Sequence, residues 1–184
     1  MKDAEKTFRS HARKGKSDWL SDNFYILERQ AERAYDDCRK SEHEGLIDSL
    51  FERCSPLCPK GILCSEEKLV EHFLPKGLSG TETAYLPVAL TCALLDKAAK
   101  GVRMRNESGE KQLSNAVTSL RKMGSYDFDM IGERLFAAEE YFQNDPEGIY
   151  RAMDSDSKRV YRQRLSAAAA KAKKSERDFA DAVP

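Results

Sequence analysis

The sequence predicts an all-α protein, built as an irregular antiparallel array of about seven to nine helices. Apolar residues recur at spacings of three and four along most of the 184 residues, as they do on one face of an α-helix. No segment shows the sustained alternation of a half-buried strand. Glycine, proline and helix-capping residues separate the apolar runs. A chain of this length can bury roughly 70% of its unfolded surface, so we expect residues 17–184 to form a single helical domain.

The first half of the chain is expected to hold three helices. The longest covers residues 17–38, where one stripe contains Trp19, Leu20, Asn23, Phe24, Leu27, Ala31 and Ala34. A shorter helix follows around residues 46–51, and the prolines and glycine of residues 55–64 predict an irregular connection. The third helix begins after Ser65 with acidic residues, which suit the positive end of the helix dipole.

The second half is expected to contain the core helix and several shorter ones. Residues 84–99 form the most apolar stretch, which should start or kink at Pro87 and end at Gly101, just beyond the last helical residue. Periodic runs with their stop signals then predict helices over residues 112–123, 128–142, 146–153 and 157–173.

The end of the chain predicts that it continues into a longer protein. Ser175, with Asp178 three residues on, predicts the cap of one more helix. The apolar residues after this cap, Phe179, Ala182 and Val183, have little sequence left against which to pack. We therefore expect the chain to be a fragment.

Two predicted caps, Asp145 and Asp154, enclose the short helix over residues 146–153. Asp145 can accept a hydrogen bond from the first turn, and Pro146 suits the first helical position because no N–H is needed there. Tyr150 shares one face with aliphatic neighbours at helical spacing. We therefore expect a rigid elbow that orients the following helix, with the Tyr150 ring buried.

Charge and apolar content exclude several classes of partner. The chain carries 31 basic and 31 acidic residues, so no overall field attracts nucleic acid or an anionic membrane. Residues 1–16 are basic, and we expect a disordered arm there, with contact to anionic lipid as the alternative. No apolar run approaches the roughly 18 residues of a membrane span. We expect no nucleic-acid partner, and a membrane only through other parts of a longer protein.

The search for a reaction centre gives no catalytic, cofactor-binding or metal-ligating residue. Cys54, Cys58 and Cys64 lack the second ligand pair of a closed zinc site, so we interpret them as core or loop residues. The two Asp-x-Asp triplets, beginning at residues 127 and 154, lie at predicted helix starts, where aspartate caps the helix. We expect no cofactor.

Three polar residues lie within or beside apolar stripes: Asn23, Ser119 and Arg121. A buried polar group must find partners or cost about 1–3 kcal/mol. We expect these residues to tie helices together, and a ligand pocket is the alternative.

Four short segments carry a resemblance to a known family. They lie in the family's order at residues 17–26, 85–90, 115–121 and 145–162, and they include Trp19, Asp22, Asn23, Phe24, Pro87, Ser119, Arg121, Asp145, Pro146, Tyr150, Asp154, Tyr161 and Arg162. In these segments the chain resembles the N-terminal region of cyclic β-1,2-glucan synthases. Those are very large bacterial inner-membrane enzymes with a membrane glycosyltransferase unit and a glycoside-phosphorylase-like unit. The family usually has arginine where Lys158 stands here.

The resemblance implies a non-catalytic helical accessory domain of a membrane-bound cyclic β-1,2-glucan synthase. Its partners would be the transferase and membrane domains of the same parent chain, which transfer glucose from a nucleotide sugar. It would lie on the cytoplasmic side of the bacterial inner membrane. The alternative is a carbohydrate- or partner-binding helical domain acting on its own. The reading frame downstream of Pro184 discriminates these two hypotheses. Only the accessory domain of a synthase requires membrane spans and a transferase motif there.

Overall fold

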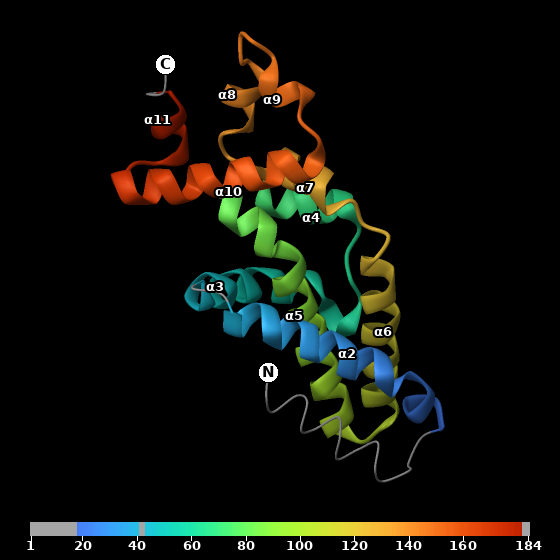
Figure 1. The fold of residues 1–184 in the computed structure, drawn as a ribbon. Coiled ribbons are helices and arrows are strands. Elements are labelled where there is room, and N and C mark those ends of the chain that lie inside the picture. The colour runs from blue at the N-terminus through green and yellow to red at the C-terminus, as the bar shows by residue number, and fades with distance from the viewer. Residues whose placement is uncertain (1–17, 41–42, 182–184) are drawn as a thin grey trace. The chain divides into compact units, whose positions relative to one another are not determined.

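The computed structural model describes residues 18–40 and 43–181, and their fold is all-α, as predicted (Figure 1). These residues form ten α-helices and two short 3₁₀ helices, without a strand. The expected basic arm over residues 1–16 lies outside them. The chain divides into two compact units. The first unit contains the residues up to Cys64 and Pro87–Tyr126, and the second unit contains Ser65–Leu86 and the residues from Asp127 onward. That residues 17–184 form a single domain remains a prediction.

Four α-helices build the first unit. They are α2 (Asp18–Lys40), α3 (Glu44–Cys54), the later part of α5 (Gly80–Met104) and α6 (Glu107–Met123). The 3₁₀ helices η1 (Ser55–Leu57) and η2 (Pro59–Gly61) occupy the connection that the sequence predicted to be irregular. The core is almost wholly aliphatic, with Leu27, Leu50, Leu90, Leu94 and Val117 buried.

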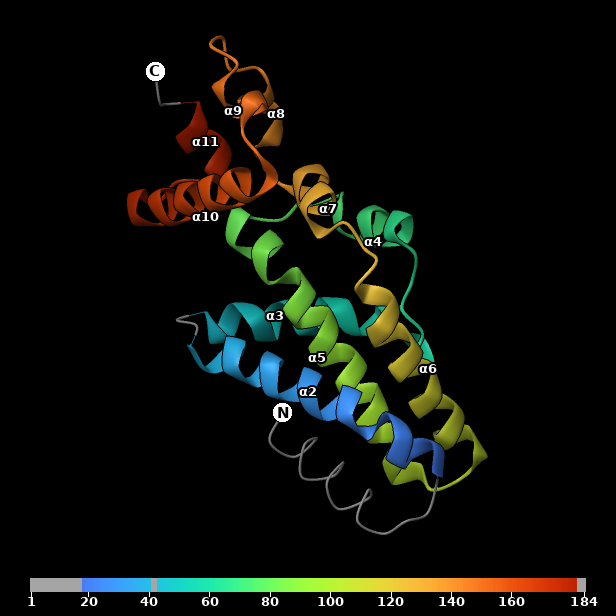
Figure 2. The same ribbon diagram turned by 45° about the vertical axis from the view of Figure 1, so that its right-hand side comes forward.

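Helices α5 and α6 form an antiparallel hairpin (Figure 2). Their backbones approach closely at two glycines, Gly101 and Gly109. A Cβ on Gly101 would lie 2.6 Å from the carbonyl oxygen of Gly109. Further along, the Gln112 side chain donates to the Lys97 carbonyl at 2.7 Å. The prediction that Gly101 ends the core helix is therefore wrong, because α5 continues to Met104 and needs glycine for this close approach.

The second unit contains the first two turns of α5 and six further helices. These are α4 (Glu66–Phe73), α7 (Phe128–Leu135), α8 (Glu139–Gln143), α9 (Ile149–Ala152), α10 (Ser155–Ala172) and α11 (Glu176–Ala180). The predicted cap Ser65 accepts a hydrogen bond from the Lys68 amide at the start of α4. None of the helices in the described ranges is both long and apolar enough to cross a bilayer.

Helix α5 starts at Gly80, earlier than predicted, and passes through Pro87. The reason is a reciprocal cap: the Glu82 amide donates to the Ser79 hydroxyl at 3.1 Å, and the Ser79 amide donates to the Glu82 carboxylate at 2.8 Å. This capping box satisfies two amides that the first turn would otherwise leave unpaired. The expectation of a helix start at Pro87 is therefore wrong.

The single helix predicted over residues 128–142 is divided at Phe136. Its backbone is extended there, with φ −66° and ψ 120°. Leu78 pairs with this segment: its amide donates to the Leu135 carbonyl at 2.7 Å, and its carbonyl accepts from the Ala137 amide at 3.0 Å. The helix therefore ends because a distant segment supplies the hydrogen bonds that its next turn would have made.

The elbow between Asp145 and Asp154 is only partly as predicted. Asp154 caps α10 through the Ser157 amide at 2.8 Å, as expected. Asp145 does not lie next to a helix start, because α9 begins at Ile149 after Gly148, whose φ is 67°. Its carboxylate instead accepts from the amide of Glu147 at 3.0 Å and from that of Tyr150 at 3.2 Å. These bonds hold Pro146 in a turn rather than in the first helical position.

The last helix does find a packing partner. Phe179 and Ala180 of α11 pack against a buried cluster of Phe136, Ala138 and Leu165. Ser175 caps this helix through the Asp178 amide at 3.1 Å, as predicted. The expectation that Phe179 has little against which to pack is wrong, because earlier parts of the chain, Phe136 and Ala138 between α7 and α8 and Leu165 of α10, provide an apolar surface. Ala182 and Val183 lie outside the described residues.

Candidate functional site

A buried arginine lies at the centre of the second unit. Arg162 is only 1% exposed, and it is the largest fully buried side chain among the described residues. It continues the buried stripe of α10 that contains Leu165, Ser166 and Ala169, at helical spacings of three, four and seven. At Gly80, the start of α5 approaches the Arg162 backbone so closely that a Cβ would collide with it.

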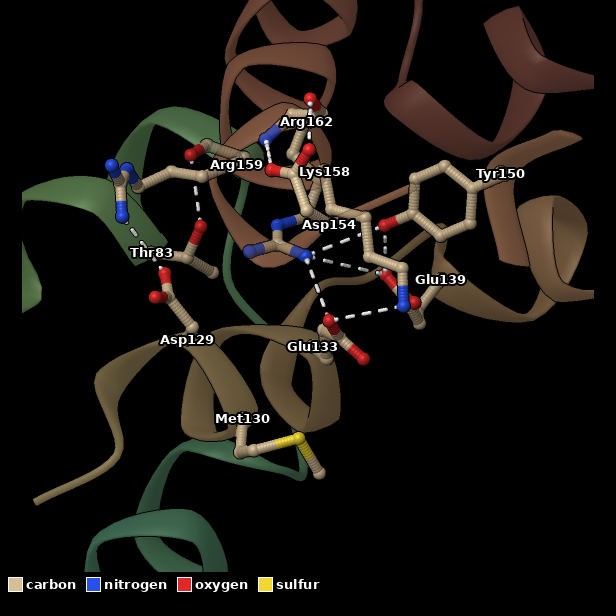
Figure 3. Close-up of polar contacts among 12 residues, drawn as sticks. Thr83, Asp129, Met130, Glu133, Glu139, Tyr150, Asp154, Lys158, Arg159 and Arg162 are labelled. Atoms are coloured by element: carbon tan, nitrogen blue, oxygen red, sulfur yellow. Dashed lines mark hydrogen bonds and ion pairs between the residues drawn. The ribbon is translucent and has the colours of Figure 1, made fainter. Parts of the chain in front are cut away.

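Four side chains surround the Arg162 guanidinium, and with it they make up the Arg162 network (Figure 3). Its Nη1 donates to the Tyr150 hydroxyl at 3.3 Å. The same atom lies 4.0 Å from a carboxylate oxygen of Glu133 and 4.0 Å from one of Glu139. Tyr150 donates to Glu139 at 2.8 Å, and the Lys158 ammonium lies 3.3 Å from Glu133. Two cations therefore face two carboxylates, so the network is neutral as a whole.

The Arg162 guanidinium makes few hydrogen bonds for a group that is almost completely buried. An arginine side chain has five N–H donors, yet the Arg162 guanidinium makes one hydrogen bond among the described residues, the bond to Tyr150. Its Nε is buried and finds no acceptor in the described parts of the chain. A buried donor left unsatisfied costs about 1–3 kcal/mol, more when charged. Arg162 Nε is thus a buried donor that the described residues leave unsatisfied.

The Tyr150 phenol is held in its protonated form. Burial raises its pKa, Glu139 raises it further, and Arg162 opposes the shift. The protonated hydroxyl can therefore donate to Glu139 while it accepts from Arg162. The ring is 2% exposed, so the prediction of a buried Tyr150 is confirmed.

Aromatic rings continue from Tyr150 toward the surface. Phe142 lies 5.3 Å from the Tyr150 ring and 5.2 Å from the Tyr161 ring, and it stacks on Phe136 at 6.1 Å. Tyr161 is 40% exposed at the end of this series. The rings hold α8, α9 and α10 together.

A cleft of about 570 Å³ lies beside the Arg162 network in the second unit. Three segments form its walls. They are residues 74–77, residues 133–140 except Ala138, and residues 175–177 at the start of α11. Glu133 and Glu139 belong to this wall, and each side chain is 14% exposed. Glu133 and Glu139 therefore lie between the cleft and Arg162, which is not itself among the residues that line the cleft.

Two side chains of α11 close one side of the cleft. The Arg177 Nε donates to the Ala137 carbonyl at 2.7 Å. The Glu176 carboxylate accepts from the Gly80 amide at 3.1 Å and from the Ser166 hydroxyl. Burial raises the pKa of Glu176, and these two hydrogen bonds act in the opposite direction.

The residues predicted to tie helices together in the first unit do so. Arg121 donates to the Asn23 side chain at 2.7 Å and thereby joins α6 to α2. The Ser119 hydroxyl accepts from the Leu63 amide at 2.9 Å and donates to the Gly61 carbonyl at 2.8 Å. The side chains of Trp19, Asp22 and Phe24 lie outside the described residues, although α2 includes their backbone.

Cys54, Cys58 and Cys64 are core or loop residues of the first unit, as interpreted from the sequence, and Cys64 is half-buried. Cys54 and Cys58 are fully buried, and burial raises the pKa of the Cys58 thiol to about 12. Within residues 18–40 and 43–181, no three histidine, cysteine or acidic side chains come together in a way that could hold a metal ion.

In the second unit, the structure brings together only part of the last predicted segment. Tyr150, Tyr161 and Arg162 lie in or beside the network, whereas Asp145 accepts backbone hydrogen bonds in the turn before α9 and Asp154 caps α10. Sequence reasoning missed Glu133 and Glu139. Their partners lie on α9 and α10, and neither carboxylate has a local pattern that marks it.

Comparisons of this chain with models of protein families, with curated proteins and with solved structures find no match. The chemistry of the site therefore rests on its own geometry. The charges of the Arg162 network are paired internally, and its guanidinium is buried.

Proposed function

We propose that this chain is a non-catalytic helical domain of a membrane-bound cyclic β-1,2-glucan synthase. In this proposal it supports the transfer of glucose from a nucleotide sugar by other domains of the same parent chain. The observation that carries the proposal is the burial of Tyr150 and Arg162, at 2% and 1% exposed. They belong to the last of the four segments in which the chain resembles that family, and both serve internal contacts.

The other residues of that segment support the same interpretation. The Asp145 and Asp154 carboxylates accept backbone hydrogen bonds, and these bonds lower the pKa of each. An acid used as a general acid needs a raised pKa. These aspartates therefore suit the capping of turns and helices rather than proton transfer.

The proposed role is to support the transferase and membrane domains from the cytoplasmic side of the bacterial inner membrane. The Arg162 network and the aromatic series fix α8, α9 and α10 to one another. A domain held in this way can present a fixed surface to a partner domain. We propose neither a nucleic-acid partner nor a cofactor.

Two measurements test this function. The reading frame beyond Pro184 should encode several membrane spans followed by a nucleotide-sugar transferase motif. The purified chain, incubated with UDP-glucose and magnesium, should neither transfer glucose nor bind UDP-glucose. A micromolar dissociation constant for UDP-glucose, or a stop codon directly after the Pro184 codon, would favour an independent binding domain instead.

A further inference from the structure

We propose that Cys38 and Cys92 are a redox-responsive thiol pair, which a peroxide oxidises to a disulfide that ties α2 to α5. Both residues belong to the first unit, although they lie far apart in the sequence. All five cysteines of the chain are free thiols in the structure. The disulfide is therefore a second covalent state of this unit, and it is independent of the proposed function.

The first argument is the contact between the two thiols. The Cys92 thiol donates a hydrogen bond to the Cys38 sulfur, so the two side chains point at each other. The faces of the two helices also meet around this contact, because Asp37 of α2 and Thr91 of α5 line the same cleft of about 270 Å³. A disulfide forms without backbone movement only between cysteines on neighbouring segments whose side chains converge in this way.

The second argument is the difference in exposure between the two thiols. Cys38 is half-buried, whereas Cys92 is only 8% exposed. A dissolved oxidant reacts with the thiol that solvent reaches. Cys38 is therefore the residue that a peroxide meets first, and Cys92 lies next to it as the thiol that completes the bond.

The reaction balances with hydrogen peroxide as the oxidant. The Cys38 sulfur attacks one peroxide oxygen and breaks the O–O bond, which gives a sulfenic acid and one molecule of water. The Cys92 sulfur then attacks the Cys38 sulfur and displaces the hydroxyl group, which leaves with the Cys92 proton as a second molecule of water. Two electrons pass from the two sulfurs to the peroxide, and one S–S bond is formed.

The surroundings of the two thiols make this oxidation slow. Burial raises the pKa of the Cys38 thiol, and the hydrogen bond from Cys92 acts in the opposite direction. Burial also raises the pKa of Cys92, to about 12. Because the thiolate is the reactive form, both shifts slow the reaction at neutral pH. The pair therefore suits a response to sustained peroxide rather than rapid catalytic turnover.

The test is incubation of the purified chain with excess hydrogen peroxide, followed by trypsin digestion and mass spectrometry without reductant. Trypsin releases Cys38 in residues 34–39 and Cys92 in residues 77–97, and neither peptide contains another cysteine. We expect these two peptides to be joined, with the loss of two thiols per chain and their return on treatment with dithiothreitol. The bond closes a long loop, so the urea midpoint of unfolding should rise by about 1 M.

Two serine variants assign the bond. Cys38→Ser removes the more exposed thiol and should abolish both the joined peptide and the rise in the urea midpoint. Cys64→Ser is the matched control, because Cys64 is also a half-buried thiol of the first unit. It should form the joined peptide in the same yield as the unmodified chain. Oxidation in concentrated urea should instead give a mixture of pairings, because the contact between the two helices is then lost.

Several results would overturn the proposal. One is the absence of thiol loss after prolonged oxidation, and another is thiol loss without the joined peptide. A third is pairing of Cys92 mainly with Cys54, the buried thiol with which it also interacts electrostatically. Equal yields of the joined peptide from the native and the urea-unfolded chain would show that the fold contributes nothing. A lowered urea midpoint of the oxidised chain would show that the native fold does not accommodate the bond.

Discussion

The two units of this chain hold their helices together by different means. In the first unit, α5 and α6 touch backbone to backbone at Gly101 and Gly109 around an aliphatic core. Its long-range polar contacts include neutral ones, such as those of Ser119 with a loop amide and a loop carbonyl. In the second unit, a buried arginine and two carboxylates lie among the helices. Close glycine contacts occur in both units, at Gly101 in the first and at Gly80 in the second, so the difference lies in the buried charges that the second unit adds to them.

The largest expected effect comes from removing the buried cation of the second unit. Arg162→Ala should lower the free energy of unfolding by roughly 3–5 kcal/mol, the range for breaking a buried ion pair, because Glu133 and Glu139 lose their shared counter-charge. Urea denaturation measures the change. Arg164→Ala, at an exposed position of the same helix, is the control and should change stability little. Equal effects of the two substitutions would remove the proposed contrast between the units.

A smaller effect should follow from disturbing the helix contact of the first unit. Gly101→Ala places a methyl group 2.6 Å from the Gly109 carbonyl oxygen and should cost about 1–3 kcal/mol through overpacking. Gly45→Ala is the matched control, because a methyl group there meets nothing within 4 Å. It should stabilise α3 by about 0.5–1 kcal/mol through helix propensity. Thermal unfolding of both variants checks the sign of each change.

The smallest expected effect is a pH dependence that arises from the second unit. Burial raises the pKa of Glu176 above its ordinary value of 4.5. Its contribution to stability is therefore fully present below that value and is lost as the pH rises through the raised pKa. Glu176→Gln keeps an acceptor for the Gly80 amide but cannot ionise, so it should flatten the dependence. Urea midpoints between about pH 4 and pH 7 measure this, and exposed Glu140→Gln should leave the slope unchanged.

Local signals predicted much of the fold. The caps Ser65, Asp154 and Ser175 are where the sequence places them, because a cap depends on residues within one turn. Ser79 and Glu82 form a capping box of the same local kind, which was overlooked. The burial of Arg162 could also have been found, since it shares a helical stripe with Leu165 and Ala169.

Other features depend on contacts that no local pattern encodes. The end of α7 requires Leu78, which lies far away in the sequence. The roles of Glu133 and Glu139 depend on how α9 and α10 bring Tyr150, Lys158 and Arg162 to them. Glycine is favoured both at the end of a helix and where two helices approach closely. The sequence around Gly101 does not distinguish these two cases.

The central claim is that the segment containing Tyr150 serves internal structure rather than chemistry on glucose. Tyr150→Ala and Tyr150→Phe in the full-length protein test it, with melting temperature and glucan synthesis in membranes measured together. Tyr150→Ala should cost about 3 kcal/mol as a large buried ring is lost, and synthesis should fall with stability. Tyr150→Phe should lower stability by about 1 kcal/mol through the lost hydrogen bonds and keep glucan synthesis. If Tyr150→Phe leaves the melting temperature unchanged and abolishes synthesis, the hydroxyl is a ligand contact or glucosyl acceptor, and the structural account is contradicted.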